Sequence, residues 1–505
     1  MEYKLGKYED VKRETRWATV EEIRRATTRL DLYDDVYPTA GIPIMSDGHV
    51  AYVDGKDTHT LIFGATGSKK TRLFCMPMLN YFIKAGESFI ATDPKGELYD
   101  KTSGLARAKG YKTVVLNFRD IGKGDMWNPL KVPYDVYRSG KTDEATAMLN
   151  DFMQILAEPL FGNTKDLFWP QMASSLGLAN LLLLMEAATP EEANVSSLAS
   201  LCTVESAKIL KELSKSMSLT HIAGMNYRSV LLNPDTTLQN ILATLFGLVR
   251  IFVSQKELSN MLSGNTVDIT RFGKEKTAVY IIVPDEKSTC HFLVTTFIKQ
   301  VYEMLIAEAQ KEEKRTLPIR VNFVLDEFCN IPTIPDMPSM ISAARSRNMR
   351  YFLIVQSIHQ LKARYGENAD TIKGNCDNWV FLTSRELELL QEISTLCGSY
   401  QTSGGGSRSL ISISELQRLD KEKGEALIMH GRQYPVISEI ADIDQYSMFK
   451  GYDAKPLSRY NMPNAKVFDL EKLNKQIFRK ERPVPFSKDN TDTRGSTGIY
   501  NPFQF

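Results

Sequence analysis

A glycine-containing loop between a predicted strand and a predicted helix limits the folds open to this chain. Residues 61–71 read LIFGATGSKKT and match the pattern G-x-x-x-x-G-K-[ST] at Gly64, Lys70 and Thr71. An apolar, β-branched segment at 58–63 precedes the loop, and a helical pattern follows it. In such a loop, backbone N–H groups surround phosphate oxygens and the next helix adds a favourable dipole. The phosphate loop (residues 64–71) therefore predicts a nucleotide-binding α/β protein.

The residues of the phosphate loop are the candidate contacts for the nucleotide, which we take to be ATP. Lys70 would reach the β- and γ-phosphates, and the Thr71 hydroxyl would bind Mg²⁺. The full set of loop candidates is Gly64, Ala65, Thr66, Gly67, Ser68, Lys69, Lys70 and Thr71.

Lys69 departs from the pattern, which has glycine at this position. A Cβ and a long side chain there would strain the loop or crowd the nucleotide. Alternatively, the side chain would point away and leave the phosphate cradle intact. The departure puts the rate of ATP hydrolysis in question, but not the fold.

A second strand, far downstream, ends in two carboxylates. The apolar residues 321–325 are followed by Asp326 and Glu327. Asp326 would hold Mg²⁺ through water, and Glu327 would polarise the attacking water. Buried strands that end in Asp-Glu are common, so this pair is informative only together with the phosphate loop. Together the two motifs predict an NTPase of the RecA-like class.

Polar residues at both ends of a third strand are further candidates. The predicted strand at 350–356 ends at Gln356. Ligands of open α/β sheets bind beyond the carboxyl ends of the strands, so Gln356 would lie near the γ-phosphate unless it only caps the strand. Arg345, Arg347 and Arg350 stand at the other end. They form a solvated helix end, or they offer a positive charge to the nucleotide of a neighbouring subunit.

Strand and helix patterns alternate along most of the chain. Strands are predicted at 58–63, 88–93, 111–118, 277–284, 319–326, 350–356, 379–383, 426–429 and 436–439, and helices at 72–85, 97–109, 288–310, 337–346 and 386–396. Such alternation with continuous apolar strands predicts a mostly parallel sheet covered on both faces. Residues 140–265 lack strand patterning and carry apolar residues at helical spacing, which predicts an inserted all-α domain.

The predicted domain division follows from these patterns. Residues 58–139 and 266–442 form the nucleotide-binding motor domain, interrupted by the all-α domain at 140–265. Residues 1–57 are an N-terminal flank, with a short helix that begins at the capping box of Thr19 and Glu22. Residues 38–58 are rich in turn formers, and residues 403–409 (SGGGSRS) are predicted to be a flexible loop. Residues 443–505 form a C-terminal extension, with a short amphipathic helix at 468–480 and a polar tail.

Composition excludes several classes of protein. The chain of 505 residues has 62 Lys and Arg against 61 Asp and Glu, a net charge of +1, which excludes a strongly basic nucleic-acid binder but not a locally basic face. The six cysteines show no C-x-x-C spacing, which argues against zinc and for reduced thiols in the cytosol. Apolar stretches at 176–185 and 241–253 are interrupted and fall short of the about 20 residues of a membrane span, so both are expected to be buried helices.

The ordered set of motifs resembles the TraG-type coupling proteins of type IV secretion and conjugation systems. The resemblance runs from about residue 16 to about residue 439. Its motifs are the phosphate loop with Pro77 and Asn80, DPKGEL at 93–98, NPL at 128–130, LDEF at 325–328 with NIP at 330–332, QS at 356–357, GNCD at 374–377 and SEL at 414–416.

The resemblance implies a RecA-like P-loop ATPase with an inserted all-α domain that helps to select the substrate. It implies hexameric rings at the cytoplasmic mouth of a secretion channel, at the inner face of the cell membrane. The implied partners are single-stranded DNA with its relaxase, or effector proteins, and the type IV secretion channel components. Arg345 matches the arginine that the family offers across the subunit interface. Family members usually carry N-terminal transmembrane helices, so we expect a soluble member, a separate membrane-anchoring partner or a trimmed chain.

Two other functions remain open at this point. One is a substrate-docking adaptor that binds nucleotide but barely hydrolyses it, as Lys69 suggests. The other is a double-stranded DNA translocase of the related septal-pump type. It fits less well, because the large helical insert and the D-P-K-G-E element at 93–97 match the coupling proteins better.

Overall fold

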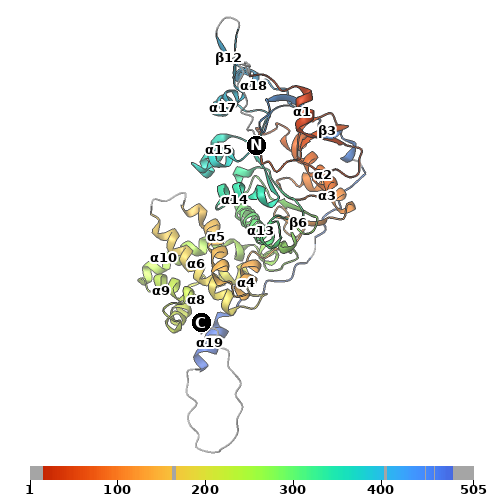
Figure 1. Ribbon diagram of the computed structural model, residues 1–505. Coiled ribbons are helices and arrows are strands. Elements are labelled where there is room, and N and C mark those ends of the chain that lie inside the picture. Colours follow the sequence, from red (N-terminus) through yellow and green to blue (C-terminus); the bar gives the residue numbers. More distant parts are fainter. Residues whose placement is uncertain (1–14, 162–165, 403–405, 450, 460, 481–505) are drawn as a thin grey trace, which may run out of the picture.

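The structure is a computed structural model of the chain and describes residues 15–161, 166–402, 406–449, 451–459 and 461–480. The molecule is elongated in Figure 1, with a sheet covered by helices in the upper part and a group of helices from residues 131–261 in the lower part.

In the described part of the chain, nine strands form one sheet, in the order β14-β13-β10-β4-β9-β8-β5-β7-β6. Their bounds are β4 Thr60–Phe63, β5 Ser88–Asp93, β6 Lys112–Asn117, β7 Thr277–Ile282, β8 Val321–Leu325, β9 Met349–Val355, β10 Asn378–Phe381, β13 Glu425–His430 and β14 Val436–Glu439. The strands from β10 to β6 in this order are parallel, and β13 and β14 add an antiparallel edge. The predicted α/β fold with a mostly parallel sheet is confirmed.

The sheet is buried on both faces, and alternate side chains of each strand enter different cores. In β4, Leu61 and Phe63 belong to one core and Ile62 to the other. On the side of Ile62 lie the helices α2 (Met76–Ala85) and α3 (Glu97–Ala108), and on the opposite side lie α13 (His291–Lys311) and α14 (Met337–Ala344). This two-sided covering explains why the strands are continuous apolar runs.

The helix after the phosphate loop does not begin as a regular α-helix. Residues Thr71–Cys75 form one π-helical turn, and α2 begins only at Met76. Pro77 has no N–H and its ring excludes the carbonyl four residues earlier, so the backbone widens into an i→i+5 pattern before it. The predicted helix at 72–85 is therefore present, with a π-turn at its start.

The described residues between β6 and β7 contain a series of helices. Its helices are α4 Lys131–Arg138, α5 Thr142–Phe161, α6 Phe168–Ala187, α7 Val195–Ser200, α8 Val204–Ser216, α9 Ile222–Leu231, α10 Asp235–Val249, α11 Ile251–Ser254 and α12 Lys256–Met261. The apolar stretch at 176–185 lies in α6, where its side chains are buried among the other helices, as predicted. Among the described residues, no helix combines the length and the apolar character that a membrane crossing requires.

The N-terminal flank contains a small sheet that the sequence patterns missed. Helix α1 (Val20–Ala26) begins at the predicted capping box, and β1 (Thr28–Asp31), β3 (Val50–Asp54) and β2 (Ile42–Ser46) then pair antiparallel in this order. The expectation of turns at 38–58 was wrong for two of these strands. Both strands are short, and the register between β2 and β3 shifts at Pro43 and Met45, which breaks the alternation.

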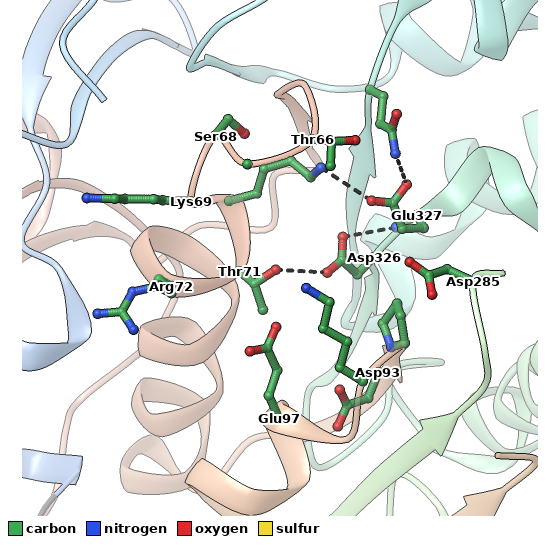
Figure 2. A pocket seen from close by; sticks show the side chains of 15 residues that line it. Thr66, Ser68, Lys69, Thr71, Arg72, Asp93, Glu97, Asp285, Asp326 and Glu327 are labelled. Atoms are coloured by element: carbon green, nitrogen blue, oxygen red, sulfur yellow. Dashed lines mark hydrogen bonds and ion pairs between the residues drawn. The ribbon is translucent and has the colours of Figure 1, made fainter. Parts of the chain in front are cut away.

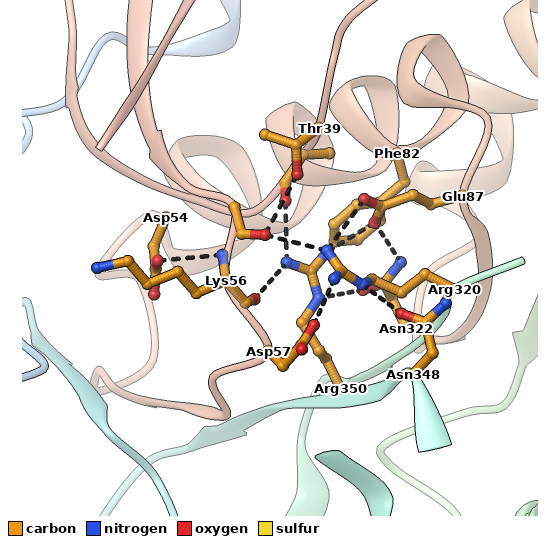
Figure 3. Close-up of polar contacts among 12 residues, drawn as sticks. Thr39, Asp54, Lys56, Asp57, Phe82, Glu87, Arg320, Asn322, Asn348 and Arg350 are labelled. Atoms are coloured by element: carbon orange, nitrogen blue, oxygen red, sulfur yellow. Dashed lines mark hydrogen bonds and ion pairs between the residues drawn. The ribbon is translucent and has the colours of Figure 1, made fainter. Parts of the chain in front are cut away.

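Arg350 anchors this flank to the main sheet (Figure 3). Its guanidinium lies 2.6 Å from the Glu87 carboxylate and donates to Asn322 Oδ1 at 2.8 Å and to the Ala40 carbonyl at 2.9 Å. The side chain is 1% exposed, so it is closed to a neighbouring subunit. Of the three arginines considered for that role, Arg350 is therefore structural, because a buried guanidinium requires its paired carboxylate.

Two short elements complete the described chain. Ser407–Ser409, predicted to belong to a flexible loop, forms strand β12 and pairs with β11 (Ser399–Gln401), while residues 403–405 lie outside the described residues. The described residues 451–459 and 461–469 lie between the sheet and the lower helices, where α19 (Leu470–Lys480) confirms the predicted C-terminal helix (Figure 1). Arg459 fixes this segment through Asp120 at 2.8 Å and Glu257 at 3.1 Å. The predicted polar tail lies outside the described residues.

Candidate nucleotide-binding site

The phosphate loop is closed by close backbone packing at Gly64. The Gly64 N–H donates to the Val355 carbonyl at 3.1 Å, and the Ala65 N–H donates to the Thr383 carbonyl at 3.0 Å. A Cβ at Gly64 would lie 2.4 Å from Ser68 Oγ and 2.8 Å from Lys70 Cγ, so any larger residue would displace the side chains of the loop. Gly64 and Ala65 thus hold the loop against β9 and the end of β10.

Lys69 occupies a left-handed backbone conformation, with φ +66°. This conformation explains the glycine of the motif, and it costs a lysine on the order of 1 kcal/mol. The side chain points away from Thr71 and Asp326 (Figure 2), and its Nζ lies 2.7 Å from the Glu422 carboxylate. Lys69 thus strains the loop, as one expectation had it, while its side chain leaves the phosphate cradle open, as the other had it.

The predicted Mg²⁺-binding side chains and two of the three predicted catalytic ones, Glu327 and Gln356, converge in one pocket (Figure 2). Thr71 Oγ1 donates to Asp326 Oδ2 at 3.2 Å. Lys70 Nζ lies 3.3 Å from Glu327 Oε1, and Gln356 Nε2 donates to Glu327 Oε2 at 2.7 Å. These residues follow β4, β8 and β9, which are neighbours in the sheet, so their carboxyl ends meet at one edge.

Two adjacent carboxylates of this pocket, Asp326 and Glu327, lie beside the Lys70 ammonium. Burial raises the pKa of Asp326 to about 6, the Lys70 ammonium opposes this increase, and the Glu327 charge adds to it. Glu327 has φ +54°, and its N–H donates to Asp326 Oδ1 at 3.0 Å. A hydroxyl and a carboxylate side by side are oxygen ligands that suit Mg²⁺, which takes its other ligands from water and phosphates. Thr71 and Asp326 therefore fit a Mg²⁺ ion.

Several residues that line the pocket were not assigned a role from the sequence, namely Arg72, Asp93, Pro94, Lys95, Glu97 and Asp285. The lining residues are Thr66, Gly67, Ser68, Lys69, Lys70, Thr71, Arg72, Asp93, Pro94, Lys95, Glu97, Asp285, Asp326, Glu327 and Gln356. The 93–97 turn lines the pocket because it follows β5, which lies next to β8. Asp285 lines it because it follows β7, which lies next to β5. The strand order would have identified both, but the order of strands cannot be deduced from the sequence alone.

Arg345 lies apart from this pocket. It precedes β9, whereas the pocket lies at the other end of β9, about 20 Å away for a strand of this length. Its guanidinium lies 2.8 Å from the Asp377 carboxylate, and its side chain is 44% exposed. The structure therefore brings the predicted residues Thr66–Thr71, Asp326, Glu327 and Gln356 together in the pocket. Gly64 and Ala65 do not line it, and Arg345 lies at the opposite edge of the sheet.

The sequence also matches a known protein family over most of its length. A family model described as type IV secretory system conjugative DNA transfer matches residues 16–422. The chain belongs to this family. The resemblance to TraG-type coupling proteins is therefore confirmed.

Two relatives from Escherichia coli in this coupling protein family are each named conjugal transfer protein TraG. One is 23% identical over 408 residues, which cover 76% of this chain and 62% of the relative. The other is 22% identical over 485 residues, covering 87% of this chain and 74% of the relative. The chain thus spans less than two thirds of the first relative.

Solved structures of the plasmid coupling protein TrwB have the same fold. The complex of TrwB with the ATP analogue ADPNP has a TM-score of 0.64 at 14% identity, covering 89% of this chain and 97% of TrwB. The complex with ADP and Mg²⁺ has a TM-score of 0.61 at 15% identity, covering 90% and 97%. At this identity the likeness shows the fold, and it confirms the predicted RecA-like architecture.

Proposed function

We propose that this chain is an ATP-driven coupling protein of conjugative DNA transfer. It binds ATP with Mg²⁺ at the phosphate loop, hydrolyses it, and uses the cycle to deliver substrate to a type IV secretion channel. The observation that carries the proposal is the convergence of Lys70, Thr71, Asp326, Glu327 and Gln356 at one edge of the sheet. Membership of the family and the nucleotides held by TrwB support it.

Each converging side chain has a role in this proposal. The loop N–H groups and the Lys70 ammonium bind the phosphates, and Thr71 and Asp326 hold Mg²⁺, which neutralises the charge of the phosphates. Glu327 accepts a proton from the attacking water. The Gln356 amide, hydrogen bonded to Glu327, positions this carboxylate and senses the γ-phosphate.

The proposed assembly is a homo-hexameric ring in which Arg345 completes the site of the neighbouring subunit. Its exposure and its distance from its own pocket support this role. The helices of the predicted 140–265 domain face the substrate, which is single-stranded DNA with a relaxase, or a protein. The ring sits at the inner face of the membrane, beside the secretion channel and a separate membrane-anchoring partner.

Lys69 favours a second candidate function, a docking adaptor that binds ATP but hardly hydrolyses it. Its left-handed backbone, φ +66°, is the strained feature that glycine would relieve. The direction of its side chain, toward Glu422 and away from Asp326, favours the ATPase instead.

Replacing Lys70 with alanine tests the nucleotide site. Charge-assisted hydrogen bonds contribute about 1.5–3 kcal/mol each, so ATP affinity is expected to fall about 10- to 150-fold, with loss of DNA-stimulated hydrolysis. Titration with a fluorescent ATP analogue and a phosphate-release assay measure both effects. The control is Lys101→Ala, an exposed lysine of α3 that does not line the pocket. Unchanged hydrolysis in Lys70→Ala would refute the proposal.

Replacing Lys69 with glycine separates the ATPase from the adaptor. If the chain is an ATPase, turnover of Lys69→Gly is expected within about threefold of the natural chain, because the lysine side chain already leaves the cradle open. The free energy of unfolding is expected to rise by about 1 kcal/mol as the strain is relieved. Steady-state kinetics and denaturant titration measure these. Negligible turnover of the natural chain that rises more than about tenfold in Lys69→Gly would favour the adaptor.

A further inference from the structure

The turn at 93–97, the DPKGE element, has a defined geometry between β5 and α3. Asp93 Oδ2 accepts the N–H of Tyr99 at 2.9 Å, in the first turn of α3. Gly96 takes a left-handed conformation, φ +82°, and is the N-cap of the helix. Asp93 and Gly96 therefore have structural roles: they set where the turn leaves the sheet and where the helix begins.

Arg119, just beyond β6, fixes the turn from outside. Its Nε and Nη2 donate to the Pro94 carbonyl at 3.1 and 2.8 Å. Its Nη1 and Nη2 donate to the two carboxylate oxygens of Glu286 at 2.8 and 2.9 Å. One planar guanidinium thus joins the turn to the loop after β7, in a paired geometry that Lys could not reproduce.

Lys95 lies in the turn that Arg119 braces through its contacts with Pro94 and Glu286. It is exposed and lines the pocket together with Thr71 and Asp326. Within the described chain, Lys95 has no hydrogen-bond or ion-pair partner. The other cations that line the pocket are all paired: Lys69 with Glu422, Lys70 with Glu327, and Arg72 with Asp442.

The sheet order places Lys95 opposite the phosphate loop. Lys70 follows β4 and Lys95 follows β5, with β9 and β8 between them. Three strand spacings separate β4 from β5, about 14 Å in all. A triphosphate that extends from the loop across the ends of β9 and β8 points its terminal phosphate toward the 93–97 turn.

We infer that Lys95 is a second phosphate-binding lysine, which contacts the γ-phosphate of bound ATP from the side opposite Lys70. The inference rests on the proposed ATP site and adds to it a residue that distinguishes ATP from ADP. Arg119 acts as a positioning residue, because it reaches the nucleotide only through the turn that carries Lys95.

The test is the affinity of the full chain for a non-hydrolysable ATP analogue and for ADP, both with Mg²⁺. In Lys95→Gln the affinity for the analogue is expected to fall about 10- to 100-fold, while the affinity for ADP stays within about threefold. Lys95→Arg retains most of the affinity for the analogue, since it keeps the charge. The control is Lys101→Gln, which removes an exposed lysine of α3 outside the pocket. Equal losses for both nucleotides, or no loss, would overturn the inference.

Arg119→Met tests the brace separately. It is expected to lower the affinity for the analogue by a smaller factor than Lys95→Gln does and to leave the affinity for ADP unchanged. A merely structural role would lower the affinity for both nucleotides alike. The double variant of Arg119→Met and Lys95→Gln is expected to lose little more affinity for the analogue than Lys95→Gln alone, because both residues act through the one contact of Lys95. Additive losses would overturn the positioning role of Arg119.

The two levels of proposal fail differently. If the natural chain binds neither the analogue nor ADP, the ATP site and the role of Lys95 are both overturned. Suppose instead that the natural chain binds both nucleotides and that Lys70→Ala lowers both affinities. If Lys95→Gln then changes neither affinity, only the role of Lys95 is overturned.

Discussion

Glu327→Gln is expected to stop ATP hydrolysis while ATP binding persists. A positioned general base contributes about 10²- to 10⁴-fold to a rate, and an amide cannot take the proton of the attacking water. Glutamine has nearly the size of glutamate, so the contact with the Gln356 amide, 2.7 Å long in the natural chain, is kept after an amide flip. The turnover number should therefore fall by at least about 100-fold, with the ATP dissociation constant within about tenfold.

The matched control for this variant is Glu97→Gln. Glu97 lines the same pocket, but Lys70 and Gln356 contact Glu327 instead. Single-turnover hydrolysis and nucleotide titration on both variants separate loss of chemistry from loss of binding. Turnover of Glu327→Gln within about tenfold of the natural chain, or equal loss in Glu97→Gln, would show that the general base lies elsewhere.

The site could be predicted from the sequence where adjacency follows from a general rule. Lys70, Asp326 and Gln356 each follow a predicted parallel strand, and ligands of such sheets bind at the carboxyl ends. The convergence needed only that the three strands be neighbours, which the order β4-β9-β8 satisfies. The ordered set of family motifs indicated that these strands are neighbours, which the isolated strand ends do not reveal.

Other features depend on contacts between distant parts of the chain, which local patterns do not encode. Arg350 was considered with Arg345 and Arg347 as a solvated helix end or a charge for a neighbouring subunit, yet its carboxylate partner, Glu87, is 263 residues away in the sequence. The left-handed backbone of Lys69 is seen only in its φ angle, which the sequence does not give. The direction of its side chain depends on Glu422, 353 residues away. Long-range ion pairs of this kind decide which charged residues are structural and which remain free to act.

Arg345→Ala is expected to lose ATPase activity through the neighbouring subunit rather than through its own site. Arginines offered across an interface contribute about 10³- to 10⁵-fold to phosphoryl transfer. Arg345 is 44% exposed and stands at the edge of the sheet opposite its own pocket, so in the proposed ring it would act on the site of another copy of the chain. Its ion pair with Asp377, 2.8 Å long, would be exchanged for the phosphates when subunits meet.

Mixing two inactive variants decides whether this arginine acts in trans. Arg345→Ala subunits keep an intact phosphate loop, and Lys70→Ala subunits keep an intact Arg345, so their mixed interfaces contain complete sites. In a random equal mixture about a quarter of the interfaces are complete, and activity should rise to about that share of the natural level. Arg347→Ala is the control, since Arg347 donates to the Ala343 carbonyl of its own chain at 2.9 Å and should keep activity. A mixture as inactive as its components, or full activity of Arg345→Ala alone, would refute the shared site and with it the need for a ring.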